Sequence, residues 1–167
     1  MKIIFGLIIA LFIIGCASMA TVEVGLNDEG IVRGTLGDIA MRVTKIELRE
    51  GDEYNTIWQG SKSVQVAIGA YDFVSITDNY VEINAGAYQS IRLTIDSLSF
   101  VQETISDLLV DTTLQFVATA FNEIVIDEGD EIRLVINIMT NNWFDNDSLQ
   151  IKQGHNPFEG AQLKIFY

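Results

Sequence analysis

The sequence has few of the residues that build disulfide frameworks, metal centres and catalytic triads. Its 167 residues include one cysteine, one histidine and one proline. A single cysteine excludes an internal disulfide, and a single histidine leaves a histidine-based zinc site without a second ligand of its kind. His155 lies in a segment with Gly154 and Pro157, which is typical of a surface histidine rather than of a triad member. The folded body must therefore depend on an apolar core, and 49% of the residues are hydrophobic.

Basic residues are also scarce. The chain has ten Lys and Arg against 23 Asp and Glu, a formal net charge of −13. A surface this acidic repels phosphate backbones, so nucleic acid is excluded as an expected partner. It also repels anionic lipid headgroups, and we expect the body to stand off any membrane to which it is attached.

The one long apolar run lies at the amino terminus and ends at the single cysteine. After Lys2, residues 3–15 carry no charge, and as a helix they would span roughly 20 Å, too short to cross a ~30 Å hydrocarbon core comfortably. One early positive charge, a short apolar stretch and small residues are typical of an export signal. Ile13, Gly15 and Cys16 also resemble the lipobox of prokaryotic lipoproteins. That resemblance implies a diacylglyceryl group on the Cys16 thiol and cleavage just before it.

This interpretation divides the chain into a lipoprotein signal peptide (1–15), a lipidated tether (16–20) and a β-sandwich domain (21–167). The mature protein would keep 152 residues with a net charge of −14. It would be anchored outside the cytoplasm, on the cell membrane or the outer membrane, because two or three acyl chains hold a protein where one does not. Two alternatives stay open: ordinary cleavage after Ala20, which releases a soluble protein, and retention of residues 3–20 as a marginal membrane helix.

The rest of the chain has the pattern of short β-strands separated by turns. Runs rich in Val, Ile, Thr, Phe and Tyr alternate apolar and polar residues, as in 21–26, 64–68 and 131–139. In 39–48 the apolar phase changes, which predicts a bulge near Thr44 that keeps both apolar sets on the core face. Residues 127–130 are a turn signal between two strands, which predicts a β-hairpin. Residues 97–109 fit either a short helix or a twisted strand.

About nine or ten such strands predict an all-β antiparallel sandwich. The stretch VEINAGAYQSIRLTID, residues 81–96, resembles the signature of the domain of unknown function 4382 family, which is found in exported prokaryotic proteins. The resemblance implies an immunoglobulin- or transthyretin-like sandwich and brings no established activity. On physical grounds we expect a positive φ at Gly86, a buried Tyr88 ring whose hydroxyl bonds to backbone, and an acidic partner for Arg92.

Candidate ligand-binding residues lie in one loop, and their types match two kinds of ligand. Trp143 and Phe144 could stack on a sugar, although a tryptophan in a sandwich is often part of the core. Asp145 and Asp147 could supply oxygens to calcium, the one possible cofactor, as could the acidic residues of 127–130. Neither acidic run has the spacing of a known calcium loop, and aspartate is common in turns for conformational reasons.

The sequence thus predicts a non-enzymatic, membrane-anchored lipoprotein that acts as an interaction or structural module of the cell envelope. Its partner would be an envelope protein or a glycan. The alternative is a carbohydrate- or calcium-binding module that uses the loop around Trp143. A hydrolase that uses paired carboxylates is the weakest hypothesis, because nothing marks a pair among the 23 acidic residues.

Overall fold

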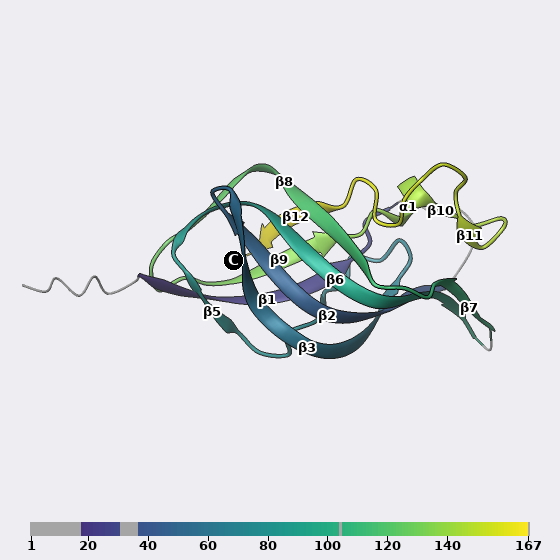
Figure 1. The fold of residues 1–167 in the computed structure, drawn as a ribbon, viewed down its shortest axis with the longest axis horizontal. Coiled ribbons are helices and arrows are strands. Elements are labelled where there is room, and N and C mark those ends of the chain that lie inside the picture. Colours follow the sequence, from purple (N-terminus) through teal and green to yellow (C-terminus); the bar gives the residue numbers. More distant parts are fainter. Residues whose placement is uncertain (1–17, 31–36, 104, 167) are drawn as a thin grey trace, which may run out of the picture.

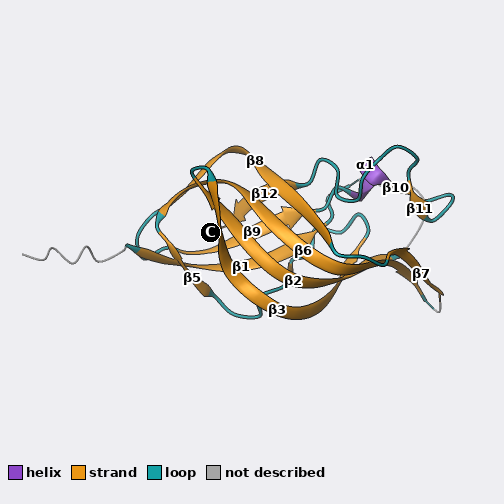
Figure 2. Cartoon of the chain, viewed as in Figure 1, coloured by secondary structure: helices purple, strands orange, loops and turns teal. Residues whose placement is uncertain are grey.

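A computed structural model describes residues 18–30, 37–103 and 105–166. The described chain is nearly all strand, with one short helix (Figure 2). The all-β prediction is confirmed. The strands are β1 (Met19–Asn27), β2 (Asp38–Glu50), β3 (Glu53–Ala67), β4 (Val74–Ser75), β5 (Val81–Asn84), β6 (Gly86–Gln102), β7 (Ile105–Val110), β8 (Leu114–Ile126), β9 (Glu131–Asn137), β10 (Phe144–Asp145), β11 (Gln150–Ile151) and β12 (Gln162–Phe166), and the helix is α1 (Thr140–Trp143).

Ten strands form one mixed sheet that is nearly closed into a barrel. The order is β3-β2-β6-β8-β12-β9-β1-β4, with β5 paired to β1 and β7 paired to β6. Two neighbouring pairs, β1 with β9 and β8 with β12, are parallel, and the other pairs are antiparallel. The sheet can curve around the core because β2 and β6 are long, with 13 and 17 residues, and contain bulges that bend them. A small second sheet, β10–β11, lies at one end of the body, with β7 at the same end (Figure 1).

The predicted bulge in β2 is confirmed. The register of β2 against both β3 and β6 shifts between Val43 and Lys45. On either side of this shift, Val43 and Ile46 are fully buried. The extra residue therefore restores the apolar phase toward the core. Most of the undecided segment 97–109 is strand: β6 continues to Gln102 and pairs with β7, which begins at Ile105.

The predicted hairpin between β8 and β9 is wrong. Residues 127–130 do form a turn, in which the Asp130 amide donates to the Asp127 carbonyl at 3.2 Å. However, β12 lies between β8 and β9 in the sheet and pairs with both. The carboxy-terminal strand is distant in sequence, so an alternation pattern around one turn gives no indication of it.

Two of the three expectations for the Gly86 region hold. The Tyr88 ring is buried and its hydroxyl donates to the Asn84 carbonyl at 2.6 Å, and Arg92 pairs with Glu47. The expectation for Gly86 is wrong. The described glycines with a positive φ are Gly51, Gly69, Gly129, Gly154 and Gly160. A Cβ atom on Gly86 would make only an ordinary 4.0 Å contact with Tyr88.

The folded body begins two residues before the predicted domain boundary. β1 starts at Met19, and Ala20 is buried opposite Ile83 of β5. Residues 19 and 20 thus belong to the sheet rather than to the tether. Cys16 and the predicted signal peptide lie outside the described residues. Among those residues, no helix combines the length and the apolar character needed to span a membrane.

Candidate functional site

The aromatic residues of the predicted ligand-binding loop are part of the core. Trp143, in the last position of α1, is fully buried, and its indole Nε1 donates to the Ile138 carbonyl at 2.9 Å. Its ring centroid lies 5.1 Å from that of Phe158. Phe144 is also buried and stacks on Phe100 with centroids 5.2 Å apart. Neither ring has a free face at the surface, so the structure contradicts their assignment as a sugar-stacking platform.

The acidic residues of the same loop make hydrogen bonds within the loop. Asp145 accepts hydrogen bonds from the Asp147 amide at 3.1 Å and from the Ser148 hydroxyl at 2.7 Å. The bond from Ser148 lowers the pKa of the Asp145 carboxyl. Asp147 is exposed. Within the described residues, no group of three or more His, Cys, Asp and Glu is arranged to hold a metal ion.

His155 also lies at the surface, as the sequence predicts. Its ring is exposed, and Nδ1 lies 2.8 Å from a carboxylate oxygen of Glu159, four residues later. Both side chains are about half exposed. This contact joins two residues of the loop that follows β11.

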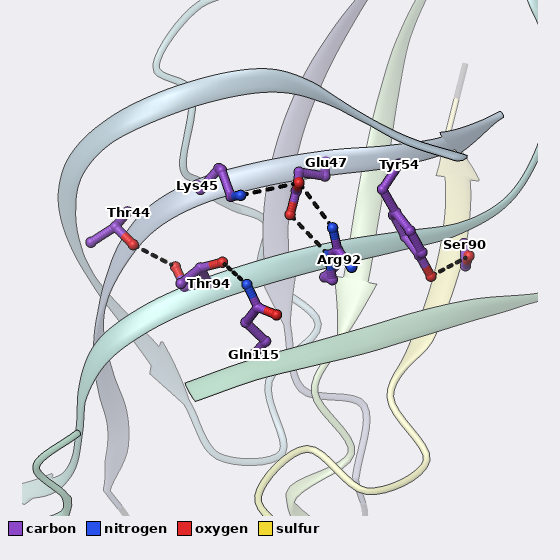
Figure 3. Close-up of polar contacts among 8 residues, drawn as sticks. All are labelled: Thr44, Lys45, Glu47, Tyr54, Ser90, Arg92, Thr94 and Gln115. Carbon is purple, nitrogen blue, oxygen red and sulfur yellow. Dashed lines mark hydrogen bonds and ion pairs between the residues drawn. The ribbon is translucent and has the colours of Figure 1, made fainter. Parts of the chain in front are cut away.

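A charged network lies on the outer face of the sheet, where β2, β3 and β6 run side by side (Figure 3). Arg92 donates to both carboxylate oxygens of Glu47, each at 2.9 Å, and the Lys45 ammonium lies 3.1 Å from Glu47. The Arg92 guanidinium also lies 4.1 Å from the centroid of the Tyr54 ring. The Tyr54 hydroxyl is 3.2 Å from the Ser90 hydroxyl. We call these five residues the Glu47–Arg92 network.

The electrostatics of this network favour a structural role. The hydrogen bonds from Arg92 hold the pKa of the Glu47 carboxyl below its usual range, and the same bonds raise the pKa of Arg92. Glu47 is 5% exposed and both of its oxygens are occupied. Such a carboxylate does not serve as a proton donor near neutral pH. Beside it, Thr44 donates to the Thr94 carbonyl and Gln115 donates to the Thr94 hydroxyl, which extends the polar row toward β8.

Replacement of Glu47 by Gln should therefore change the pH dependence of stability. A lowered folded-state pKa adds stability that is present above the unfolded-state value, about 4.3, and is lost as the pH falls through the folded-state value. We expect Glu47→Gln to reduce the free energy of unfolding by about 1–3 kcal/mol at pH 7, and the difference from wild type to shrink below about pH 4. Urea unfolding at several pH values measures this. Exposed Glu53→Gln is the control, and an equal loss at all pH values would contradict the assignment.

A second polar cluster, around Asp28, joins three loops at the end of β1. The carboxylate is fully buried. It accepts hydrogen bonds from the amides of Thr140 at 3.0 Å, Gly30 at 3.3 Å and Gly69 at 2.9 Å, and from the Thr140 hydroxyl. From the sequence this aspartate is only part of a turn signal. Its buried partners, up to 112 residues away, show that it fixes the loops after β1, β3 and β9.

The seam between β8 and β12 is a weakly paired part of the described sheet. These strands pair over only two positions, Gln162 with Thr119 and Leu163 with Ala120. Beyond them, Phe121 projects into solvent with 99% of its surface exposed. The seam holds an open groove of about 590 Å³, lined by Val117, Thr119, Ala120, Phe121, Gly160, Ala161, Gln162, Leu163 and Lys164. Such a groove, apolar and bordered by strand backbone, can bind a chain segment and has no grouping for bond-making chemistry.

Sequence patterns missed this seam. Phe121 appears in the sequence as one more apolar residue of a strand, and the separation of β8 from β12 depends on pairing between distant segments.

Comparisons with protein-family models, curated proteins and solved structures found no match to this chain. The family resemblance of residues 81–96 therefore stays a prediction, and the candidate site has to be judged from its own geometry.

Proposed function

We propose that this protein is a lipid-anchored, extracytoplasmic module that binds another macromolecule of the cell envelope and is not an enzyme. The observation that carries the proposal is the start of β1 at Met19, three residues after Cys16. Cleavage before Cys16 would leave β1 whole. Cleavage after Ala20 would remove two residues of this strand.

The contacts of those residues show what such a cut would cost. The Ser18 carbonyl accepts from the Ala85 amide at 2.7 Å, and the Met19 carbonyl accepts from the Gly129 amide at 2.8 Å. Ala20 is buried. A processing site inside this strand would break backbone bonds to two neighbouring turns, each worth about 1 kcal/mol. These contacts support cleavage before Cys16 over cleavage after Ala20.

A short tether would also set the orientation of the body. Only residues 17 and 18 separate Cys16 from Met19, where β1 begins, and three Cα–Cα steps span about 11 Å at most. The end of the body where β1 begins, at the left of Figure 1, would then face the membrane. The turns at this end are acidic, with Asp52, Asp127 and Glu128 exposed. Repulsion from anionic headgroups would hold these turns off the surface, and β7, β10 and β11, at the other end of the body, would point away from the membrane.

A non-enzymatic role fits the polar groups that the structure describes. Three carboxylates that are at least partly buried have oxygens already hydrogen-bonded to neighbouring groups of the fold: those of Asp28, Glu47 and Asp145. The exposed groove at the β8–β12 seam is lined mainly by apolar residues, with Thr119, Gln162 and Lys164 among them, which suits binding.

Replacement of Cys16 by Ser tests the anchor. The wild-type protein should be found in the membrane fraction, carry labelled palmitate and begin at residue 16 by mass spectrometry. Cys16→Ser should lose the label and the processing before residue 16, because a hydroxyl does not replace the thiol as lipid acceptor. Ala17→Ser is the matched control and should behave as wild type. An unlabelled wild-type protein, or one that begins at residue 21, would contradict the proposal.

A further inference from the structure

We propose that the seam between β8 and β12 is the docking site for an extended, basic segment of a partner protein, which adds as a strand beside β12. This inference rests on the proposed function, since it names the binding surface of the tethered module. Three features of the seam carry it: an open strand edge, an exposed aromatic anchor and the sign of the surrounding charge.

The edge of β12 is open after Leu163. The Thr119 amide donates to the Ala161 carbonyl at 3.2 Å, so the backbone groups of residue 161 point toward β8. Backbone groups alternate in direction along a strand, so those of Leu163 and Ile165 point the same way. The pairing of β8 with β12 ends at Leu163, whereas β12 pairs with β9 as far as Phe166. The amide and carbonyl of Ile165 thus face the open seam.

β8 bows away from the sheet at the same place. Its ladder with β6 passes from Thr119, opposite Ser90, to Ile124, opposite Tyr88. Residues 120–123 therefore lie opposite a single residue of β6, Gln89, and form a large irregularity of the ladder. This irregularity separates β8 from β12 and opens a wedge between them. An added strand is the ligand that best satisfies backbone donors and acceptors in such a wedge.

The groove beside this edge offers an apolar anchor point. Phe121 is 99% exposed and Val117, on the same strand, is 41% exposed. Both line the groove of about 590 Å³ together with Leu163. Covering this exposed phenylalanine ring removes apolar surface from water, so an apolar side chain on the added strand would be held here.

The charge of the chain decides between possible occupants. Lys164, the one basic residue lining the groove, is paired with Glu29. Exposed Glu123 follows Phe121 by two residues, and the exposed Asp127 and Glu128 follow along the same strand and turn. A second copy of the mature chain would bring another net charge of −14, and an anionic membrane would also be repelled. A segment that carries Lys or Arg between apolar residues is complementary both to the apolar groove and to the negative charge around it.

Titration of the mature protein, in nonionic detergent, with three blocked octapeptides tests the proposal. The first alternates Val and Lys, the second alternates Val and Glu, and the third is the Val–Lys peptide with every second amide N-methylated. We expect only the first to bind by calorimetry and to slow hydrogen exchange at the Ile165 amide. Phe121→Ser should weaken this binding roughly tenfold. Leu108→Ser, which removes a 56% exposed side chain from β7, is the matched control and should leave it unchanged.

Several results would overturn the inference. Equal binding of the Val–Lys peptide and its N-methylated form would mean charge attraction without strand addition. Failure of the Val–Lys peptide to bind at millimolar concentration, or binding that Phe121→Ser leaves unchanged, would also exclude the seam. Self-association, or binding to phosphatidylglycerol vesicles, that Phe121→Ser abolishes would assign the seam to another occupant. These readouts are independent of the Cys16→Ser result, so failure of the anchor and failure of the docking site are distinguishable.

Discussion

Replacement of Asp28 by Ala is expected to lower the free energy of unfolding by about 3–5 kcal/mol. The substitution removes the acceptor of four hydrogen bonds and leaves the donors of Gly30, Gly69 and Thr140 without it. A buried donor that loses its partner costs about 1–3 kcal/mol. Because small proteins unfold with only 5–15 kcal/mol in total, the variant should be close to its stability limit. Urea unfolding followed by circular dichroism measures the change.

Two further variants separate the hydrogen bonds from the loss of charge. Asp28→Asn keeps the shape but directs an amide NH₂ group at N–H and O–H donors, so it should recover less than half of the loss. Exposed Asp111→Ala should stay within about 0.5 kcal/mol of wild type. If Asp28→Ala cost less than 1 kcal/mol, the cluster would not be what holds the three loops.

Replacement of Trp143 by Ala is expected to cost about 3–5 kcal/mol, because the cavity left by a buried tryptophan is large. The ring is fully buried against Phe158 and Phe144, and its Nε1 bond to Ile138 would also be lost. A surface tryptophan in a ligand-binding loop would instead change stability little. Urea unfolding therefore distinguishes a core residue from a binding residue.

The second tryptophan of the chain provides the control. Trp58 is partly buried on β3, an end strand of the sheet order, and Trp58→Ala should cost less than Trp143→Ala. Acrylamide should quench the fluorescence of Trp58 and leave that of Trp143 nearly unchanged. Strong quenching of Trp143 in the folded protein would show that its ring is accessible after all.

Local patterns in the sequence were sufficient for the features that depend on neighbouring residues. The change of apolar phase in β2 predicted the bulge at Thr44, because only an extra residue keeps Val43 and Ile46 on one face. The burial of Tyr88 and the bond from its hydroxyl to backbone were expected by analogy with the corner tyrosine of β-sandwiches.

Features that depend on one residue's context were harder to predict. Gly86 needed no positive φ, because the backbone there continues directly into β6. Trp143 and Phe144 stand among Asn and Asp residues, which made their loop look exposed. The short helix α1 instead turns both rings inward, where they complete the end of the core.

By itself the sequence determined that this chain is built of β-strands around an apolar core, with an acidic composition and an apolar amino-terminal segment that ends at Cys16. Period-two alternation and charge are local properties, so they can be read without knowledge of neighbours in space. Only the tertiary structure decided that Glu47 is the partner of Arg92, that Asp28 joins three loops and that β12 separates β8 from β9. The open seam beside Phe121 arises in the same way. Each depends on which distant strand edges meet, and the free energy of that choice is shared among contacts across the whole sheet.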